Sequence, residues 1–366
     1  MRILQVVTKS ELGGAQTHVW QLAANLRVGG HDVHITAFPG GWLHDQARQH
    51  GIEFHANDAL SNSLDPLRGL RAGRKVARLA ELVHPDVIHC HSSAAGFWTR
   101  LVVRGSVPTV FTAHGWGFMP GAPRLRRIAL LAAERLVAGF TARYICVSEH
   151  DARLAVRYGI AAAGEISVIR NGIEPLERQR RDAGLNATIQ AMFVGRLARP
   201  KEPEVLVSAL SELPPQVRDA YDLQIVGDGP LRAALRDAIA RGSASVRLTG
   251  ALGREEVLER LSRTDLFVLV SRYEGLPISI LEAMSLGLAI IASDVGGVRE
   301  AVCPECGILI PPGGKEDLKR ALTRLANDRQ AIARYGAAAR QRAKEEFSVE
   351  TMCKKTETVY ESVRRK

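Results

Sequence analysis

Short apolar stretches alternate with longer amphipathic stretches along this sequence, and the alternation runs through the chain twice. Apolar stretches that favour β-strands occupy residues 3–8, 33–37, 87–91, 109–113 and 144–147, and then residues 191–194, 223–226, 246–249, 266–270 and 289–292. Stretches of helical periodicity, such as residues 15–28 and 67–83, separate them. Apolar strands bounded by helices are typical of parallel sheets that helices cover on both faces. The sequence therefore predicts an α/β fold.

The double alternation and the length of the chain indicate two domains. A chain of 366 residues exceeds the usual size of one domain. We expect one doubly wound domain at residues 1–172 and another at residues 173–349, joined by the polar, arginine-rich stretch 174–186. Ligands of such sheets bind beyond the carboxyl ends of the strands. Two sheets that face each other would place a cleft there, so the loops after the strands are the candidate functional segments.

Cysteine content and hydropathy exclude several classes of protein. The five cysteines are scattered and odd in number, which argues against a disulfide framework. Cys303 and Cys306 have half the spacing of a zinc site, but no second pair accompanies them, so we expect no metal there. No apolar run reaches the roughly 18 residues that span a bilayer. The first residues run straight into a predicted strand, which predicts a cytoplasmic protein without a cleavable signal peptide.

Positive charge is concentrated in the first half of the chain. The formal net charge is +10, and residues 1–172 hold 19 lysines and arginines against 12 acidic residues. The surplus clusters at residues 68–78 and 124–127. Solvated helix faces, contact with anionic lipid head groups and contact with nucleic acid would each explain it. No known nucleic-acid motif supports the third explanation, so we expect no nucleic-acid partner, and the first two stay open.

Two loops of the first domain carry candidate functional residues. Gly13 and Gly14 lie between a predicted strand and a predicted helix, where glycine lets the backbone approach a ligand and the helix start favours an anion. A plain turn is the alternative. His114 follows the strand at residues 109–113 and precedes Gly115, so its ring can reach a sugar hydroxyl or a phosphate. The alternative is a structural histidine.

The first loop of the second domain is basic. Gly195 ends the strand at residues 191–194, and Arg196 and Lys201 follow within six residues. An arginine forks around phosphate oxygens, and a lysine adds a mobile point charge. Together these two side chains would neutralise a diphosphate leaving group. Solvated basic residues are the alternative.

Two glutamates eight residues apart form the most specific feature. Glu274 lies in the loop after the apolar strand at residues 266–270, and Pro277 suits the first turn of a helix that ends before Gly287. Glu282 would lie inside that helix, more than a turn further along, so the two carboxylates do not form an acid/base pair. The N–H groups of the first turn can hold a phosphate between them. Two surface glutamates are the alternative, although Glu282 has apolar neighbours.

Taken in order, these loops resemble family 4 of the glycosyltransferases, a retaining group with the GT-B fold. That fold has two doubly wound, Rossmann-like domains that face each other across a cleft. The resemblance covers nearly the whole chain and rests on the segments GGA (13–15), AHG (113–115), CVSE (146–149), VIRNGI (168–173), VGRL (194–197), VGDGP (226–230), LTG (248–250), EGLPISILE (274–282) and SDVGGVREAV (293–302). It implies that a final helix, at about residues 350–366, packs back onto the first domain.

The resemblance also implies a role for each candidate residue. His114 would contact the donor sugar and its phosphate, while Arg196 and Lys201 would bind the diphosphate and stabilise it as it leaves. Glu274 would hold hydroxyls of the donor sugar, and Glu282 would hold the ribose. The remaining nucleotide-sugar-binding positions implied are Gly13, Gly14, Gly195, Gly250, Gly275, Leu276, Pro277, Ile278 and Ser279.

This sequence departs from the family pattern at two positions. The family usually has glycine after the lysine that matches Lys201, whereas here Glu202 and Pro203 follow. The added carboxylate would either weaken phosphate binding or simply point outward. Pro277 occurs in one subset of the family and removes one backbone donor from the phosphate-facing turn.

The expected reaction is the retaining transfer of a hexose-type sugar from a nucleotide-diphosphate sugar to a glycan or a lipid-linked oligosaccharide, in the assembly of a cell-surface polysaccharide. The resemblance favours UDP as the nucleotide, with GDP or ADP as alternatives. The sequence lacks the Asp-x-Asp cluster of metal-dependent transferases, so we expect neither a metal nor a cofactor. Two alternatives are a GT-B sugar-nucleotide epimerase and a non-catalytic nucleotide-sugar-binding module. A third is a phosphorylase, but the sequence context of its pyridoxal lysine is not seen. The basic helices suggest association with the inner membrane surface.

Overall fold

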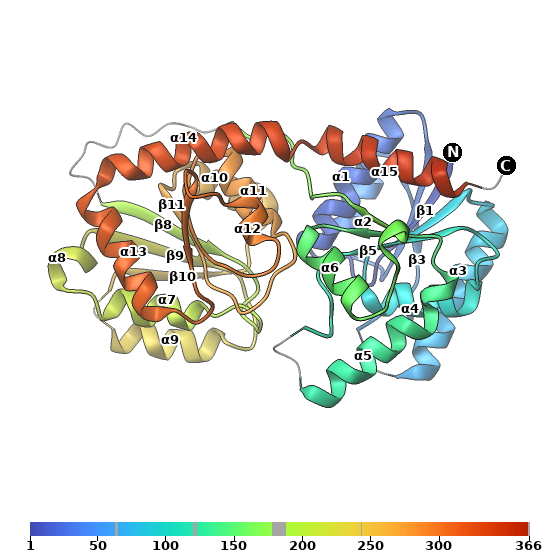
Figure 1. The fold of residues 1–366 in the computed structure, drawn as a ribbon, viewed down its shortest axis with the longest axis horizontal. Helices are drawn as coiled ribbons and strands as arrows, with labels where there is room; N and C mark the ends of the chain where they lie inside the picture. Colours follow the sequence, from blue (N-terminus) through green and yellow to red (C-terminus); the bar gives the residue numbers. More distant parts are fainter. Residues whose placement is uncertain (63–64, 120–122, 178–187, 243, 365–366) are drawn as a thin grey trace. The chain divides into compact units, whose positions relative to one another are not determined.

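The computed structural model describes residues 1–62, 65–119, 123–177, 188–242 and 244–364 (Figure 1). The chain forms two compact units. Unit 1 consists of residues 1–172 and 349–366, and unit 2 consists of residues 173–348. Each unit is built on one parallel β-sheet, so the α/β prediction is confirmed. Most of the predicted linker, residues 174–186, lies outside the described residues.

Unit 1 has a seven-stranded sheet with the strand order β3-β2-β1-β4-β5-β6-β7. Its strands are β1 (Arg2–Val6), β2 (Asp32–Ala37), β3 (Glu53–Ala56), β4 (Val87–Cys90), β5 (Thr109–Ala113), β6 (Arg143–Cys146) and β7 (Ile166–Val168). Its helices are α1 (Gly14–Val28), α2 (Trp42–Gln49), α3 (Pro66–Val83), α4 (Ser93–Val103), α5 (Arg124–Val137), α6 (Glu149–Arg157) and α15 (Val349–Val363), with 3₁₀ turns η1 (Ala138–Phe140) and η2 (Ala163–Glu165).

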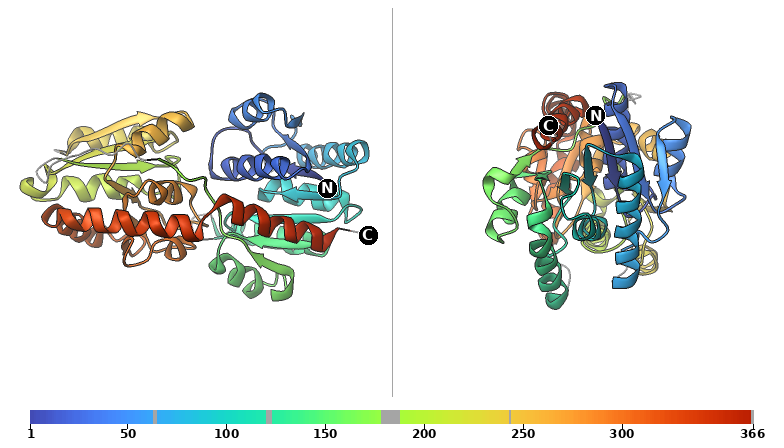
Figure 2. Two further views of the ribbon diagram at one scale, coloured as in Figure 1. Left: turned by 90° about the horizontal axis from the view of Figure 1, so that it is seen from above. Right: turned by 90° about the vertical axis from the view of Figure 1, so that its right-hand side faces the viewer.

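The two faces of this sheet carry separate apolar cores. Successive strand residues point to opposite faces, so Ile3 packs with α1, α2 and α15, whereas Leu4 packs with α3, α4 and α6. Leu130 and Leu131 of α5 also pack on the second core. The tail helix α15 lies beside α1, as Figures 1 and 2 show, and contributes Met352 to the first core.

Unit 2 has a six-stranded sheet with the order β10-β9-β8-β11-β12-β13. Its strands are β8 (Ile189–Val194), β9 (Tyr221–Val226), β10 (Val246–Gly250), β11 (Leu266–Leu269), β12 (Ala289–Ser293) and β13 (Gly307–Ile310). Its helices are α7 (Pro203–Ser211), α8 (Pro215–Arg218), α9 (Arg232–Arg241), α10 (Arg254–Ser262), α11 (Ile278–Ser285), α12 (Val298–Ala301), α13 (Lys315–Asn327) and α14 (Arg329–Glu346). Every residue of the central strands β11 and β12 is buried, as expected for a sheet covered on both faces.

The predicted strands all occur, and three further strands join them. The added strands β3, β7 and β13 are three or four residues long and lie at the edges of their sheets. Within the described residues, none of the helices combines the length and the hydropathy that crossing a bilayer requires.

Candidate active site

Glu274 and Lys201 meet at the carboxyl ends of two neighbouring strands of unit 2. Lys201 belongs to the loop after β8 and Glu274 to the loop after β11, and these strands pair in parallel. Lys201 Nζ donates to Glu274 Oε1 over 2.5 Å, and Ser271 Oγ donates to the same oxygen over 2.6 Å. Both charged side chains are largely buried. The structure thus brings together two of the predicted site residues and adds a hydroxyl that the sequence did not indicate.

Backbone contacts hold these two loops in place. An isolated antiparallel bridge joins Lys201 to Ser271. Gly296 has φ +55°, and a Cβ atom there would lie 1.7 Å from the carbonyl oxygen of Glu274, so glycine is required. The neighbouring Gly297 N–H donates to the Gly275 carbonyl over 2.8 Å. The glycine pair after β12 therefore supports the loop that carries Glu274.

The basic loop after β8 has one buried and one exposed cation. Lys201 lies against Gly195, where a Cβ atom would come within 2.7 Å of Lys201 Cδ. Arg196 is exposed. The structure places the Lys201 ammonium beside Glu274, while the guanidinium of Arg196 remains at the surface of the loop.

Glu202, the departure from the family pattern, is buried and neutralised. Its Oε1 atom accepts from Arg199 Nη1 over 3.2 Å and from Arg272 Nε over 2.5 Å. Burial without a cation would be costly for a carboxylate, and these two arginines supply the opposite charge. The expectation that this side chain points outward is wrong, because Glu202 is buried. Whether it weakens phosphate binding stays a prediction.

Glu282 lies within α11 and forms an ion pair that was not predicted from the sequence. Arg254 Nη1 donates to Glu282 Oε1 over 2.5 Å. Burial raises the pKa of the Glu282 carboxyl, and Arg254 partly offsets this effect. Arg254 opens α10, where a cation meets the positive end of the helix dipole. An arginine is unfavourable at this end of a helix, so its presence in the sequence could have indicated an acidic partner elsewhere in the fold.

The other positions predicted in unit 2 border the same helix or the strand β10. Pro277 caps α11, whose first residue Ile278 is buried and whose second residue Ser279 is half-buried. Gly275 and Leu276 are buried in the loop before it. The start of α11 thus directs main-chain N–H groups beside Glu274, which is the arrangement that binds phosphates. Gly250 ends β10 with φ +86°, and its carbonyl accepts from the Gly227 N–H over 2.8 Å.

In unit 1, the predicted glycine loop begins α1. Gly13 has an extended backbone and occupies the N-cap position, and Gly14 is the first helical residue. A Cβ atom at Gly14 would have open space around it. The side of the helix start that Gly14 faces is therefore accessible to a ligand.

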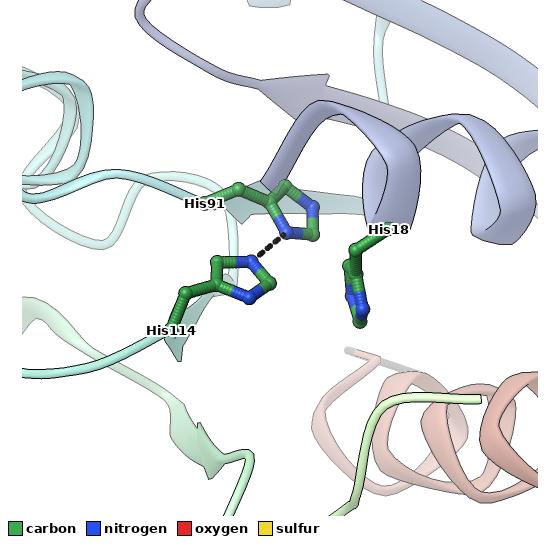
Figure 3. A group of neighbouring side chains, drawn as sticks. All are labelled: His18, His91 and His114. Atoms are coloured by element: carbon green, nitrogen blue, oxygen red, sulfur yellow. Dashed lines mark hydrogen bonds between the residues drawn. The ribbon is translucent and has the colours of Figure 1, made fainter. Parts of the chain in front are cut away.

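His114 belongs to a group of three histidines from three different elements (Figure 3). His18 lies in α1, His91 follows β4 and His114 follows β5. His114 Nε2 and His91 Nδ1 are 3.4 Å apart, and the rings of His18 and His114 meet edge to face with centroids 4.6 Å apart. His18 Nδ1 lies 3.0 Å from Asn171 Oδ1. The Nε2 atoms of His18 and His91 are buried and have no hydrogen-bond partner within the described structure, which is uncommon for buried polar atoms.

Burial keeps these imidazoles neutral. It lowers the pKa of His18 to about 4, although the hydrogen bond with Asn171 acts in the opposite direction. Burial is the main reason that the pKa values of His91 and His114 lie well below the usual value, and the charge of neighbouring histidines lowers them further. His89 beneath them is also buried, with Nδ1 2.5 Å from Tyr360 Oη of α15 and Nε2 2.6 Å from Thr112 Oγ1. Neutral imidazoles can both donate to and accept from a sugar or phosphate oxygen.

Of this group, only His114 was among the residues predicted from the sequence. His89 and His91 were visible as a His-x-His pair at a strand end, and His18 as a histidine one turn into the helix after the glycine pair. In the part of the chain that the structure describes, His18, His91 and His114 are also the group that could hold a metal, because one nitrogen of each lies within 4.8 Å of the others. The expectation that the enzyme uses no metal stays a prediction.

Comparison with known proteins defines the class of the chain. A family model described as Glycosyltransferase Family 4 matches residues 12–176, and one described as Glycosyl transferases group 1 matches residues 177–342. The chain is 30% identical to the alpha-maltose-1-phosphate synthase of Mycolicibacterium smegmatis over 392 residues, with 96% of each chain covered. It is 28% identical over 326 residues to the O-antigen biosynthesis glycosyltransferase WbnH of Escherichia coli, with 88% of this chain and 89% of that one covered. The chain is therefore a glycosyltransferase.

Solved structures share its fold. HepE of Anabaena in complex with UDP-glucose superimposes with a TM-score of 0.82 at 22% identity, covering 99% of this chain and 100% of that one. The sucrose-phosphate synthase of Thermosynechococcus elongatus gives a TM-score of 0.83 at 21% identity, with 99% of each chain covered. The fold is GT-B, with two Rossmann-like domains. The chain belongs to family 4 of the glycosyltransferases, as the order of its motifs had indicated.

Proposed function

We propose that this glycosyltransferase moves a hexose from a nucleotide-diphosphate sugar, with UDP as the nucleotide, to a glycan or lipid-linked oligosaccharide during cell-surface polysaccharide assembly. The observation that carries the proposal is the contact of Lys201 with Glu274 beside the start of α11. There a cation and main-chain N–H groups can take up a diphosphate, and a carboxylate can take up sugar hydroxyls.

The names of relatives support the substrate classes. HepE of Anabaena has been solved with UDP-glucose. A relative from Escherichia coli that is 28% identical over 288 residues, covering 74% of each chain, is named UDP-Gal:alpha-D-GlcNAc-diphosphoundecaprenol alpha-1,3-galactosyltransferase. Its name combines a UDP-sugar donor with a lipid diphosphate acceptor, which is the combination proposed for this chain.

Each side chain has a proposed task in the reaction. Lys201 and Arg196 stabilise the negative charge that develops on the departing diphosphate, so the reaction needs no metal ion. Glu274 exchanges part of its contact with Lys201 and Ser271 for hydroxyls of the donor sugar. Glu282, oriented by Arg254, holds the ribose. His114 is kept neutral by burial and donates to the donor near the reacting bond.

We propose that further residues contact the donor through their backbone or through small side chains. They come from the start of α1, the end of β8, the end of β10 and the first turn of α11. The residues are Gly13, Gly14, Gly195, Gly250, Gly275, Leu276, Pro277, Ile278 and Ser279. We propose retention of configuration by front-face attack, in which the departing phosphate takes the proton of the acceptor.

We propose that the enzyme works at the cytoplasmic surface of the membrane. The exposed arginines of α3, which are Arg71, Arg74 and Arg78, would be drawn to the negative potential of that leaflet. Lys75 of the same cluster is instead paired with an acidic residue, since its Nζ donates to Asp58 Oδ1 over 2.6 Å. The acceptor proposed above is anchored in the same surface.

Two measurements test the reaction. A thermal-shift screen of UDP-, GDP- and ADP-sugars identifies the donor, and we expect a UDP-sugar to raise the melting temperature most. Proton NMR of the product, formed in the presence of EDTA, then reports the new anomeric linkage. We expect the donor's configuration and full turnover with EDTA present. An inverted product, or activity that EDTA abolishes, contradicts the proposed mechanism.

A further inference from the structure

Helix α5 exposes an apolar stripe. Leu125, Ile128 and Leu136 are 82%, 55% and 65% exposed, and Ala129 and Ala132 between them are exposed as well. These positions follow one another at spacings of three, one, three and four residues, which places them on one side of a helix with 3.6 residues per turn. The side that a globular protein normally turns toward its core is here turned outward.

The opposite side of α5 is fixed to unit 1, so the stripe cannot rotate inward. Glu134 is buried, and Arg100 Nη2 donates to its Oε2 atom over 2.7 Å. Leu130 and Leu131 pack on the core below, and Arg127 Nε donates to the Phe118 carbonyl over 2.7 Å. The buried ion pair and this packing give the helix one orientation.

Arginines border the stripe. Arg124 and Arg126 are exposed on either side of Leu125, and Arg135 is exposed beside Leu136. A helix with a bulky apolar stripe flanked by cations is the pattern of helices that lie in the plane of a membrane interface, with the apolar side in the acyl boundary and the arginines at the phosphates.

A second helix of the same layer has a related surface. Helix α3 lies on the same side of the sheet as α5, with α4 in contact with both (Figure 1). Its exposed residues Leu67, Arg71, Arg74, Arg78 and Leu82 again recur at helical spacing. The described residues of this layer therefore present a basic stripe on α3 and an apolar stripe on α5.

We propose that α5 is the membrane-docking helix of this enzyme, and that Leu125, Ile128 and Leu136 enter the interface of an anionic bilayer. This inference rests on the proposed function at the membrane surface and assigns it to one element. Charge decides between a bilayer and a second copy of the chain. If two copies paired through this stripe, the arginines around Leu125 and Leu136 of one copy would lie near those of the other and repel them. Anionic lipid head groups would instead neutralise these arginines. Docking would hold unit 1 beside a lipid-linked acceptor.

The test is flotation of the full chain with vesicles of phosphatidylcholine that contain about a quarter phosphatidylglycerol, compared with vesicles of pure phosphatidylcholine. The stripe variant combines Leu125→Ser, Ile128→Ser and Leu136→Ser. We expect it to bind the anionic vesicles at least about tenfold more weakly, because the apolar area that enters the acyl boundary is lost. The variant Arg124→Gln/Arg126→Gln should weaken binding to the anionic vesicles and reduce its dependence on salt.

The matched control is Val28→Ser, which removes an exposed valine at the end of α1 that is 91% exposed. It should bind vesicles as the wild type does. Donor-induced thermal shifts confirm that all variants are folded.

Wild-type protein that fails to float would contradict the membrane setting itself. Wild type that floats together with an equally bound stripe variant would overturn the assignment to α5 alone. A wild-type dimer that the stripe variant converts to a monomer, without vesicle binding, would show that the stripe joins two copies.

Discussion

At the scale of single residues, the site is built from charges that meet across long sequence distances. Lys201 and Glu274 are 73 residues apart, and Arg254 and Glu282 are 28 apart. Each carboxylate is largely buried and each has a cation beside it. Because burial of an unpaired charge is costly, these partners hold the site in position before a substrate arrives.

Replacement of Arg254 should destabilise unit 2. Arg254→Gln leaves the buried Glu282 carboxylate without its cation, and we expect the free energy of unfolding to fall by about 3 kcal/mol. Because the pKa of Glu282 is already raised by burial, the loss should be larger at pH 8 than at pH 5, where the carboxyl can take up a proton. Urea unfolding followed by circular dichroism measures this.

The double variant Arg254→Gln/Glu282→Gln is the control for that experiment. It removes both charges, so it should recover most of the lost stability. Equal destabilisation by the single and the double variants would show that packing, rather than the charge of Glu282, makes Arg254 important.

Glu202 should have little influence on donor binding. Its carboxylate is buried against Arg199 and Arg272, so its charge is compensated where it lies. We expect Glu202→Gln to change the KM for the donor by less than about twofold. If steady-state kinetics showed a KM lowered about fivefold or more, the carboxylate would have to act on the diphosphate directly.

At the scale of elements, the ends of β4 and β5 and the start of α1 enclose four neutral histidines. His18, His89 and His91 are buried in unit 1 and His114 is half-buried, and desolvation lowers the pKa of each. The unfolded chain binds protons at histidine with a pKa of about 6.5. Folding therefore excludes protons that the unfolded state accepts below that pH.

Unit 1 should lose stability as the pH falls below about 6.5. Above that pH the histidines are neutral in both states and contribute no pH dependence. Below it, each contributes a loss of up to about 1.4 kcal/mol per pH unit until its folded-state pKa is reached. All four tryptophans of the chain lie in unit 1, so urea unfolding followed by tryptophan fluorescence reports on this unit.

Two variants distinguish the effect of the buried histidines from that of an exposed histidine. His91→Gln should reduce the slope of stability against pH, whereas His50→Gln, at an exposed position after α2, should not. A slope that is the same in the wild type and in His91→Gln would show that this histidine is accessible to protons in the folded state.

The elements that sequence could predict are those with a strong local pattern. β11 and β12 are continuous apolar runs that are buried throughout, and α11 begins and ends near Pro277 and Gly287 as predicted. The short edge strands, such as β3 with its sequence EFHA, lack such a pattern, because the neighbouring strand determines them. The histidine group was missed for a related reason, since His18 and His91 become neighbours of His114 only through the order of the strands.

At the scale of the whole molecule, the chain completes unit 1 with its last helix. α15 contributes Val349, Met352 and Tyr360 to the core beneath α1, and Tyr360 Oη lies 2.5 Å from His89 Nδ1. The fold of unit 1 therefore depends on residues that are made after the whole of unit 2.

Truncation after Ser348 should destabilise unit 1 selectively. The loss of α15 exposes one face of the first core, and we expect a loss on the order of 5 kcal/mol or more. Tryptophan fluorescence should then show a shifted emission and an unfolding midpoint at much lower urea. Truncation after Val363, which keeps α15, is the control and should behave as the full chain does. An unchanged midpoint after removal of α15 would contradict its role in the core.

In the reaction that we propose, a sugar leaves its nucleotide at the contact of Lys201 with Glu274 and passes to an acceptor. The direct measurement is release of nucleoside diphosphate from the donor that the thermal-shift screen selects, with and without a lipid-linked or glycan acceptor. We expect the acceptor to accelerate release in the wild type. Lys201→Ala should slow it by about 10²–10³-fold, whereas Lys315→Ala, which removes a half-buried lysine that donates to Glu212, should not. Full turnover in Lys201→Ala, or release that no acceptor stimulates, would contradict the claim.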